Sequence, residues 1–320
     1  MEKINNVISQ LIESKNLGLQ NGLMGMCVGL CINNNMDPII STSMDYIYSN
    51  IESIKKNISI ANGLMGIAFG IDFLIKHNAC DGNLDRILSD IDDIIYKQCE
   101  KIDYNDIQTV YEVLAYIYMR LGDGLLEKSG RKIFELLAIE LIEGIYRQKE
   151  NHMFIEPIPY RATYYLSWFL ILTSIYHKVG IYTKRIRMIW TEIKPLVHSI
   201  IPCLNANKLW MMFAVKLVYS ENKEANWLNY HNLLADSIIS IDSIISHEFL
   251  DKQIFFTDGI AGIYLLCHYY NSIKGNTLTF SNELFKRRLY SSTIWDTFGE
   301  KDTRFGLDGL LGILVLLNKL

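Results

Sequence analysis

The chain has 320 residues, of which 50% are hydrophobic, with only five prolines and a formal net charge of -4 at pH 7. This length can bury a large core, either as one repeat domain or as two ordinary domains, and the scarcity of proline favours helices. The slightly acidic balance lacks the basic footprint of a nucleic-acid-binding protein, which argues against a nucleic-acid partner.

Targeting and membrane signals are not evident in the sequence. The N-terminus lacks the apolar core of a signal peptide, and the richest apolar runs, 22–32 and 309–317, are shorter than the roughly 20 residues of a membrane-spanning helix. We therefore expect a cytoplasmic protein with no membrane span. Six cysteines occur without a Cys-x-x-Cys pair, so we predict neither a disulfide framework nor a zinc knuckle.

A short phrase recurs four times: two glycines three residues apart, with Asn or Asp before the first and an apolar run after the second. The copies begin at Asn21, Asn62, Asp258 and Asp308, and their first glycines are spaced by 41, 196 and 50 residues. Since the middle spacing is about four ordinary ones, we expect three eroded copies within it. Apolar runs fill those slots, so that repeats start near positions 22, 63, 109, 163, 208, 259 and 309. A period of about 40 to 50 residues is typical of stacked supersecondary units.

Along the chain, two kinds of predicted helix alternate. The run after each repeat start is almost wholly apolar, as in a helix buried on all sides. The segments between these runs have apolar residues at spacings of three and four, as in a helix with one buried face; examples are residues 84–95, 133–141 and 238–245. Seven alternations predict an all-α fold, an α/α toroid of seven helical hairpins with inner and outer helix rings, in which residues 1–320 form a single domain.

The repeated phrase predicts close packing and helix capping. Glycine inside a helix costs roughly 1 kcal/mol relative to alanine, so its recurrence indicates that backbones approach where no side chain fits. We assign this role to Gly25, Gly29, Gly66 and Gly70. The Asn or Asp before each first glycine is placed to accept a hydrogen bond from an unpaired N–H group of the first helical turn. This predicts side-chain caps at Asn21, Asn62, Asp258 and Asp308.

In these features the chain resembles the lanthionine synthetase C-like (LanC-like) family, the thioether cyclases of lanthipeptide biosynthesis. The resemblance covers the whole chain, since family members are seven-hairpin α/α toroids whose inner helices open with a Gly-x-x-Gly phrase. It implies a zinc ion at the toroid mouth, which binds the thiol of a precursor-peptide cysteine before that thiol adds to a dehydrated serine or threonine. Zinc holds the thiol as thiolate, whereas a free thiol of pKa about 8.5 is only slightly ionised at neutral pH.

The chain departs from the family at the zinc ligands. The family places Cys-His immediately before the first glycine of the sixth repeat, and here those positions are Thr257 and Asp258. A third ligand, a cysteine after a tryptophan, is matched by Met211 if Trp210 is that tryptophan. We therefore identify the chain as a degenerate member of the family and expect no metal and no other cofactor.

The acid-base groups that the resemblance implies are also altered. The family's Tyr-Asp pair in the third repeat corresponds to Tyr104 and Asn105, with Asp106 next in sequence. A histidine expected in the fourth repeat falls at Ala162. The resemblance therefore implies an active site that is either lost or rebuilt.

Three functions are compatible with the sequence. The resemblance implies a protein of ribosomal peptide (lanthipeptide-type) maturation, either a zinc-independent thioether cyclase or a catalytically inactive partner that binds a precursor peptide and acts with a lanthipeptide dehydratase or other maturation enzyme. The second function is a peptide-binding pseudoenzyme outside lanthipeptide biosynthesis. The third is a carbohydrate-active α/α barrel that uses Asp258 and Asp308 as its two carboxylates.

The candidate site residues lie at the starts of the predicted inner helices. Asp258 and Asp308 are the candidate catalytic residues, and the candidate binding residues are Asn21, Asn62, Asn105, Asp106, Thr257 and Trp210. Because helix N-termini present unpaired N–H groups and partial positive charge, we expect an acidic or carbonyl-rich extended peptide as ligand. Tyr104, Tyr160 and Trp210 supply either amphipathic contact surface or core packing.

Overall fold

The computed structural model describes residues 2–33, 38–122, 126, 128–158, 160–162, 164–273, 275, 277–297 and 304–320. Across these residues all regular secondary structure is helical, which confirms the predicted all-α class. The chain divides into two compact units. Unit 1 comprises Met1–Asp103, Met119–Glu127 and Ser291–Leu320, and unit 2 comprises Tyr104–Tyr118 and Lys128–Tyr290.

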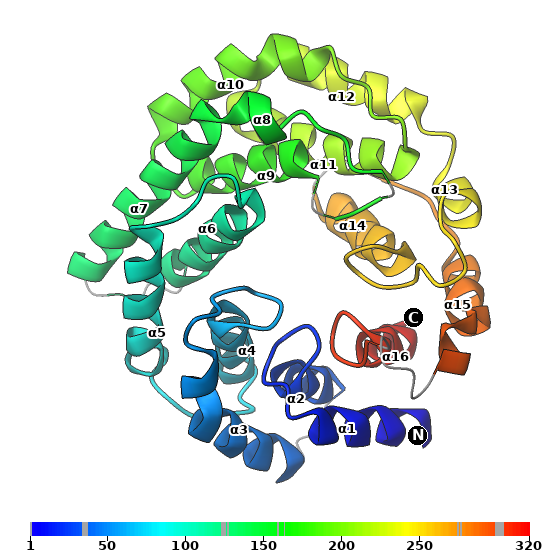
Figure 1. Cartoon of the computed structure of the whole chain (residues 1–320). Coiled ribbons are helices and arrows are strands. Elements are labelled where there is room, and N and C mark those ends of the chain that lie inside the picture. The colour runs from blue at the N-terminus through cyan, green and yellow to red at the C-terminus, as the bar shows by residue number, and fades with distance from the viewer. Residues whose placement is uncertain are drawn as a thin grey trace. The chain divides into compact units, whose positions relative to one another are not determined.

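Unit 1 joins both ends of the chain in two layers of helices (Figure 1). One layer holds the mostly buried helices α2 (Leu23–Ile32), α4 (Leu64–Lys76) and α16 (Leu310–Lys319). The other layer holds α1 (Glu2–Ser14), α3 (Pro38–Asn50), the 3-10 helix η1 (Ile51–Ile54) and α5 (Leu84–Cys99). A second 3-10 helix, η2 (Thr293–Thr297), precedes α16. Helix α2 packs against both α4 and α16, so it is the centre of the buried layer.

Unit 2 has the same two-layer organisation (Figure 1). Its mostly buried helices are α6 (Ile107–Gly122), which continues past the unit boundary, α9 (Tyr165–Lys178), α11 (Asn205–Asn222) and α14 (Ile260–Ser272). The remaining helices are α7 (Lys128–Arg147), α8 (Lys149–His152), α10 (Thr183–His198), α12 (Ala225–Ser237), α13 (Ile241–His247) and α15 (Asn282–Ser291). Helix α11 packs against α9, α12 and α14.

Each predicted repeat start coincides with the beginning of a mostly buried helix. The seven helices begin at positions 23, 64, 107, 165, 205, 260 and 310, and position 163, one of the predicted starts, lies outside the described residues. The predicted one-faced segments correspond to α5, α7 and α13. Helix α13 begins at Ile241, because Ile238 adopts extended backbone at the end of α12.

The distribution of apolar residues decides which layer a helix joins. In α2, which has ten residues, only Ile32 is not buried. In α5, the buried residues are spaced by three or four positions and share one face; they are Leu84, Leu88, Ile91, Ile95 and Cys99. A one-faced helix can bury only that stripe, so α5 covers the buried layer and leaves its polar face in solvent.

Each Gly-x-x-Gly phrase is the junction between a folded-back loop and a helix. The loop before the helix passes over the helix N-terminus, so that loop carbonyl groups accept the first N–H groups of the helix. The N–H of Leu23 donates to the carbonyl of Asn16 at 2.8 Å, and the N–H of Leu64 donates to that of Asn57 at 2.9 Å. Equivalent bonds join Ile260 to Gln253 at 3.1 Å and Leu310 to Arg304 at 2.9 Å.

The glycines of the phrase make room for the loop backbone. A Cβ atom on Gly25 would collide with the carbonyl oxygen of Leu19, and a Cβ atom on Gly66 would collide with that of Ile60. Close backbone approach is therefore correct as a prediction for these two glycines. The approaching group is the protein's own loop, not a neighbouring helix.

Two further glycines lie between neighbouring buried helices. A Cβ atom on Gly29 would lie 3.0 Å from the side chain of Leu311 in α16, and one on Gly70 would collide with the side chain of Met24 in α2. At Gly29 and Gly70 the close neighbour is therefore a side chain of the next buried helix, and the predicted approach of two backbones is not what these glycines allow.

The predicted side-chain caps are wrong at Asn21 and Asn62, whose buried Oδ1 atoms accept no hydrogen bond from the described residues. The N-cap residues of α2, α4, α14 and α16 are themselves glycines, which have no side chain to act as a cap. Loop carbonyls accept the N–H groups that the sequence assigns to the side chains of Asn21, Asn62, Asp258 and Asp308. The physical reason is that the folded-back loop already satisfies the first helical turn with backbone groups.

We expect Gly25→Ala to destabilise the protein by about 1 to 3 kcal/mol, because the new methyl group collides with a backbone carbonyl. Gly122→Ala is the matched control, since a Cβ atom at Gly122 meets nothing within 4 Å. We expect that control to be neutral or to stabilise the helix by up to about 1 kcal/mol. Urea unfolding measures both changes, and equal stability of the two variants would contradict the steric role of Gly25.

Candidate functional site

The predicted site residues divide between the two units. Unit 1 holds Asn21, Asn62 and Asp308, and unit 2 holds Asn105, Asp106, Trp210, Thr257 and Asp258. In each unit they lie at or near the N-terminal ends of mostly buried helices. The two candidate catalytic carboxylates, Asp258 and Asp308, therefore belong to different units.

In unit 1, the loops before α16, α2 and α4 are hydrogen-bonded in series. The N–H of Gln20 donates to the carbonyl of Ala61 at 2.8 Å, and the carbonyl of Gln20 accepts from the N–H of Asp308 at 3.1 Å. The loop before α2 is thus hydrogen-bonded to the loops before α4 and α16, one on each side. We call these three connected loops the loop belt; it carries Asn21, Asn62 and Asp308.

The side chains of Asn21 and Asn62 are half-buried on this belt. Their Oδ1 atoms are buried, and within the described part of the chain neither accepts a hydrogen bond. Asn62 packs on the neighbouring loop, where a Cβ atom on Gly18 would lie 2.6 Å from Asn62 Oδ1. A buried acceptor without a donor costs about 1 to 3 kcal/mol, so the packing of these loops outweighs that cost at both amides.

Asp308 is held in the loop before α16. Its carboxylate is 8% exposed, and Oδ2 lies 3.3 Å from Nη1 of Arg304. The carbonyl of Arg304 also accepts the N–H of Leu310, the first residue of the helix. The ion pair and the backbone bond together fix the loop, which gives Asp308 a structural role in unit 1.

In unit 2, the N-terminal parts of α9 and α11 carry two stacked tryptophans. The ring centroids of Trp168 and Trp210 are 6.2 Å apart, with 29° between the ring planes. Nε1 of Trp210 donates to the hydroxyl of Tyr160 at 2.7 Å, and Nε1 of Trp168 donates to the carbonyl of Ala162. Both indole rings are partly exposed, whereas Tyr160 is buried. We call Trp168 and Trp210 the tryptophan platform; its N–H groups are satisfied internally, and its rings are fixed in place.

Thr257 and Asp258 lie beside this platform. The carbonyl of Thr257 accepts from the N–H of Ala162 at 2.7 Å, which ties the loop before α14 to the segment before α9. Burial raises the pKa of Tyr160, and the thiol of Cys267 and the carboxylate of Asp258 raise it further, against the opposing effect of the hydrogen bond from the platform. The Asp258 carboxylate is therefore close enough to the buried hydroxyl of Tyr160 to act on it electrostatically.

Asn105 and Asp106 are exposed at the start of α6. Asp106 accepts from the N–H of Thr109 at 3.3 Å and from its hydroxyl at 2.6 Å, which is the geometry of a helix cap. Tyr104 packs over Gly144 of α7, where a Cβ atom would collide with its ring. Tyr160 is therefore a packing residue, whereas Tyr104 and Trp210 both pack against neighbouring groups and stay partly exposed.

Two glutamates that the sequence analysis does not identify stabilise the start of α11. The carboxylate of Glu248 accepts from the N–H groups of Asn205 at 2.8 Å and Ala206 at 2.9 Å. The carboxylate of Glu156 accepts from the two preceding N–H groups, at 2.8 and 3.1 Å. Negative charge at a helix N-terminus is favourable because it complements the helix dipole. Both glutamates are more than 40 residues away in sequence, so no local pattern could have identified them.

The N-termini of the buried helices are therefore largely covered. Loop carbonyls cover α2, α4, α14 and α16, and carboxylates cover α11. The expectation that these helices present unpaired N–H groups to a ligand is wrong for all five, because groups of the protein itself accept the N–H hydrogen bonds.

The positions of the family's zinc ligands carry no alternative metal site in the described residues. Met211 is buried in α11, and Thr257 lies in the loop before α14. Across the described ranges, no group of three or more His, Cys, Asp or Glu side chains is arranged to hold a metal ion. In the same residues, every helix is too short or too polar to cross a membrane.

No family model, curated protein or solved structure matches the chain. The likeness to LanC-like proteins therefore rests on the repeated phrase, its spacing and the alternation of buried and one-faced helices.

We expect Glu248→Ala to destabilise the protein by about 1.5 to 3 kcal/mol, because two N–H groups lose a charged acceptor. Glu248→Gln keeps one acceptor oxygen and is expected to cost less. Glu100→Ala, at an exposed glutamate, is the control and should stay within about 0.5 kcal/mol of the parent protein. Thermal unfolding at low ionic strength measures all three, and a Glu248→Ala variant as stable as the control would refute the capping role.

Proposed function

We propose that this chain is a LanC-like protein of ribosomal peptide maturation that binds a precursor peptide without catalysing its cyclisation, and that its seven helical hairpins close into an α/α toroid. The toroid is supported by seven buried helices at the repeat spacing, by their alternation with one-faced helices, and by loops that bond in series. In this proposal a lanthipeptide dehydratase or another maturation enzyme performs the chemistry on the bound peptide.

The tryptophan platform is the observation that carries peptide binding. Trp168 and Trp210 are partly exposed, stacked at 6.2 Å, and fixed by internal hydrogen bonds from both indole N–H groups. Fixed aromatic rings offer a large contact area at low entropic cost, because they lose little side-chain freedom on binding. Thr257 and Asp258, which are half-buried, add polar groups at the edge of the platform.

The covered helix N-termini change the ligand that we propose. An acidic peptide would need free N–H groups or cations, and the N–H groups at the starts of α11 and α14 are already paired. Asp258 and the exposed Arg161, which is next to Ala162, place one charge of each sign near the platform. The platform therefore favours apolar and aromatic side chains of an extended peptide.

We expect the purified protein to bind fluorescently labelled segments of the peptides encoded beside its gene with a Kd of tens of micromolar, roughly -6 kcal/mol. Trp168→Leu removes half of the platform and should weaken binding at least about tenfold. Tyr269→Ala removes an aromatic side chain that is 63% exposed near the other end of α14 and should leave binding unchanged. Fluorescence anisotropy measures the three affinities.

The proposal fails if neither leader nor core segments bind at 100 micromolar, or if both variants bind as the parent protein does. Far-UV circular dichroism and the Tm of Trp168→Leu separate lost contact from lost folding. Binding of a glycan in place of the peptides would support the carbohydrate-active alternative.

The absence of cyclase activity is tested separately with a dehydrated precursor peptide that carries free cysteines. We expect the number of alkylatable thiols to stay constant during incubation with the protein, because Thr257 and Met211 stand where the resemblance implies zinc ligands and neither can hold a thiol as thiolate. A loss of thiols that Asp258→Asn abolishes, without a change in Tm, would instead identify a zinc-independent cyclase with Asp258 in acid-base chemistry.

A further inference from the structure

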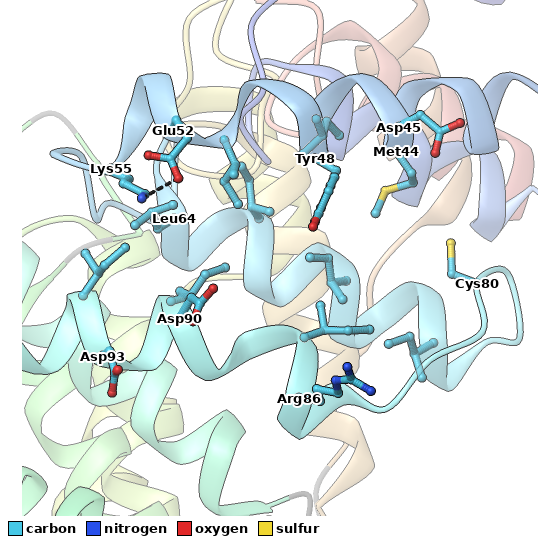
Figure 2. Close-up of a pocket in the computed structure, with 18 of the residues that line it drawn as sticks. Met44, Asp45, Tyr48, Glu52, Lys55, Leu64, Cys80, Arg86, Asp90 and Asp93 are labelled. Atoms are coloured by element: carbon cyan, nitrogen blue, oxygen red, sulfur yellow. Dashed lines mark ion pairs between the residues drawn. The ribbon is translucent and has the colours of Figure 1, made fainter.

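A long groove crosses the surface of unit 1, outside the residues discussed above. It lies between α3 with η1 on one side and α5 on the other, and α4 forms its floor (Figure 2). Its volume is about 720 Å³. Helices α3 and α5 have 13 and 16 residues, so the walls are roughly 20 to 24 Å long at about 1.5 Å per residue.

The interior of the groove is aliphatic. Isoleucines line it from all three sides, among them Ile47, Ile51, Ile71, Ile75, Ile87 and Ile94. Ile87 is 43% exposed, and Tyr48 on the opposite wall is 82% exposed. Ile87 and Tyr48 therefore leave apolar surface uncovered on both walls of the groove.

The rim of the groove is charged and mostly acidic. Glu52 and Lys55 form an ion pair with each other, drawn at one end of Figure 2. The other charges on the rim are four aspartates and two cations: Asp45, Asp81, Asp90, Asp93, Arg86 and Lys97. Figure 2 shows Asp90 and Asp93 along α5 and Asp45 on the α3 wall. Five carboxylates therefore stand against three cations around the aliphatic trough, a formal excess of negative charge, and aspartates lie on both walls.

We propose that this groove binds an amphipathic helix of a partner protein, with Leu, Ile or Val on one face and Lys or Arg on its flanks. An aliphatic trough between two helices accepts side chains at i, i+3, i+4 and i+7 of a third helix. The flanks of a helix that lies in the trough run beside both walls, where carboxylates outnumber cations, so basic residues are favoured there. The trough is three to four helical turns long, about the length of an average helix.

This site is independent of the peptide platform, which lies in unit 2. Loss of binding in the groove would therefore leave the proposed precursor-peptide binding intact, and the two proposals can fail separately. Variants in the groove and on the platform distinguish them.

The probe is a fluorescein-labelled 14-residue peptide of Leu and Lys with Leu at helical spacing. The full-length protein should bind it, and the same peptide with Glu in place of Lys, or with its sequence scrambled, should bind at least tenfold more weakly. Spectra of the protein with labelled isoleucine methyl groups should show shifts at Ile71, Ile87 and Ile94. These isoleucines all line the groove.

Two protein variants test the groove itself. Asp90→Lys with Asp93→Lys should weaken binding at least tenfold, and Ile87→Asp should do the same by placing a charge in the trough. Glu13→Lys with Glu100→Lys is the matched control, since it adds the same charge to unit 1 at exposed positions outside the groove. That control should bind as the parent protein does.

The proposal is overturned by any of three results: no binding of the Leu and Lys peptide at 100 micromolar, equal binding by the groove variants and the control, or equal binding of the Glu peptide. A dimer seen by sedimentation that Ile87→Asp abolishes would also overturn it, because the occupant would then be a second copy of this chain.

Discussion

The backbone hydrogen bonds between each folded-back loop and the start of its helix are the constraint on which the rest of the structure depends. A carbonyl can reach the first N–H groups only if the loop lies flat across the helix end, and this leaves no room for a Cβ atom on Gly25 or Gly66. Once the loop lies there, its outer edge is free to bond to the next loop, as Gln20 does with Ala61 and Asp308. One local geometry therefore sets both the start of a helix and its position beside its neighbour.

This arrangement determines what kind of recognition the ends of the helices can perform. Helix N-termini bind anions when their N–H groups are free. Here backbone carbonyls and the carboxylates of Glu156 and Glu248 already occupy those groups. Specific binding then has to come from side chains, and the partly exposed side chains at this end of unit 2 include Trp168 and Trp210. The glycine phrase is thus a structural element, and in the peptide-binding proposal the contact surface comes from the tryptophans of α9 and α11.

Much of the fold could be predicted from the sequence, because the signals for it are local. The phrase and the apolar run after it are adjacent in the chain, so all seven buried helices could be placed to within a few residues. The caps made by loop carbonyls could not be predicted, because Asn21 is a residue type that caps helices well and only the path of the loop brings a carbonyl there instead.

The candidate site was less predictable because its contacts are distant in sequence. Trp210 was identified by its position, but its stacking partner Trp168 lies 42 residues earlier, and Glu248 reaches Asn205 across 43 residues. A single tryptophan or glutamate carries no periodic signal that would reveal such a partner. The groove in unit 1 was missed for a similar reason: Ile87 and Ile94 read as ordinary members of a one-faced helix, and only the spacing of α3 and α5 leaves them uncovered.

Unit 1 combines segments that are far apart in the sequence, and this affects its folding during synthesis on the ribosome. Helix α16 packs against α1 and α2, which come far earlier in the sequence. At about 5 to 20 residues per second, the stretch from Ile32 to Leu310 takes about 15 to 55 s to translate. During that interval the apolar face of α2 that α16 later covers is open to water. Nascent chains of this protein therefore pass through a period in which chaperone binding and aggregation compete with the arrival of α16.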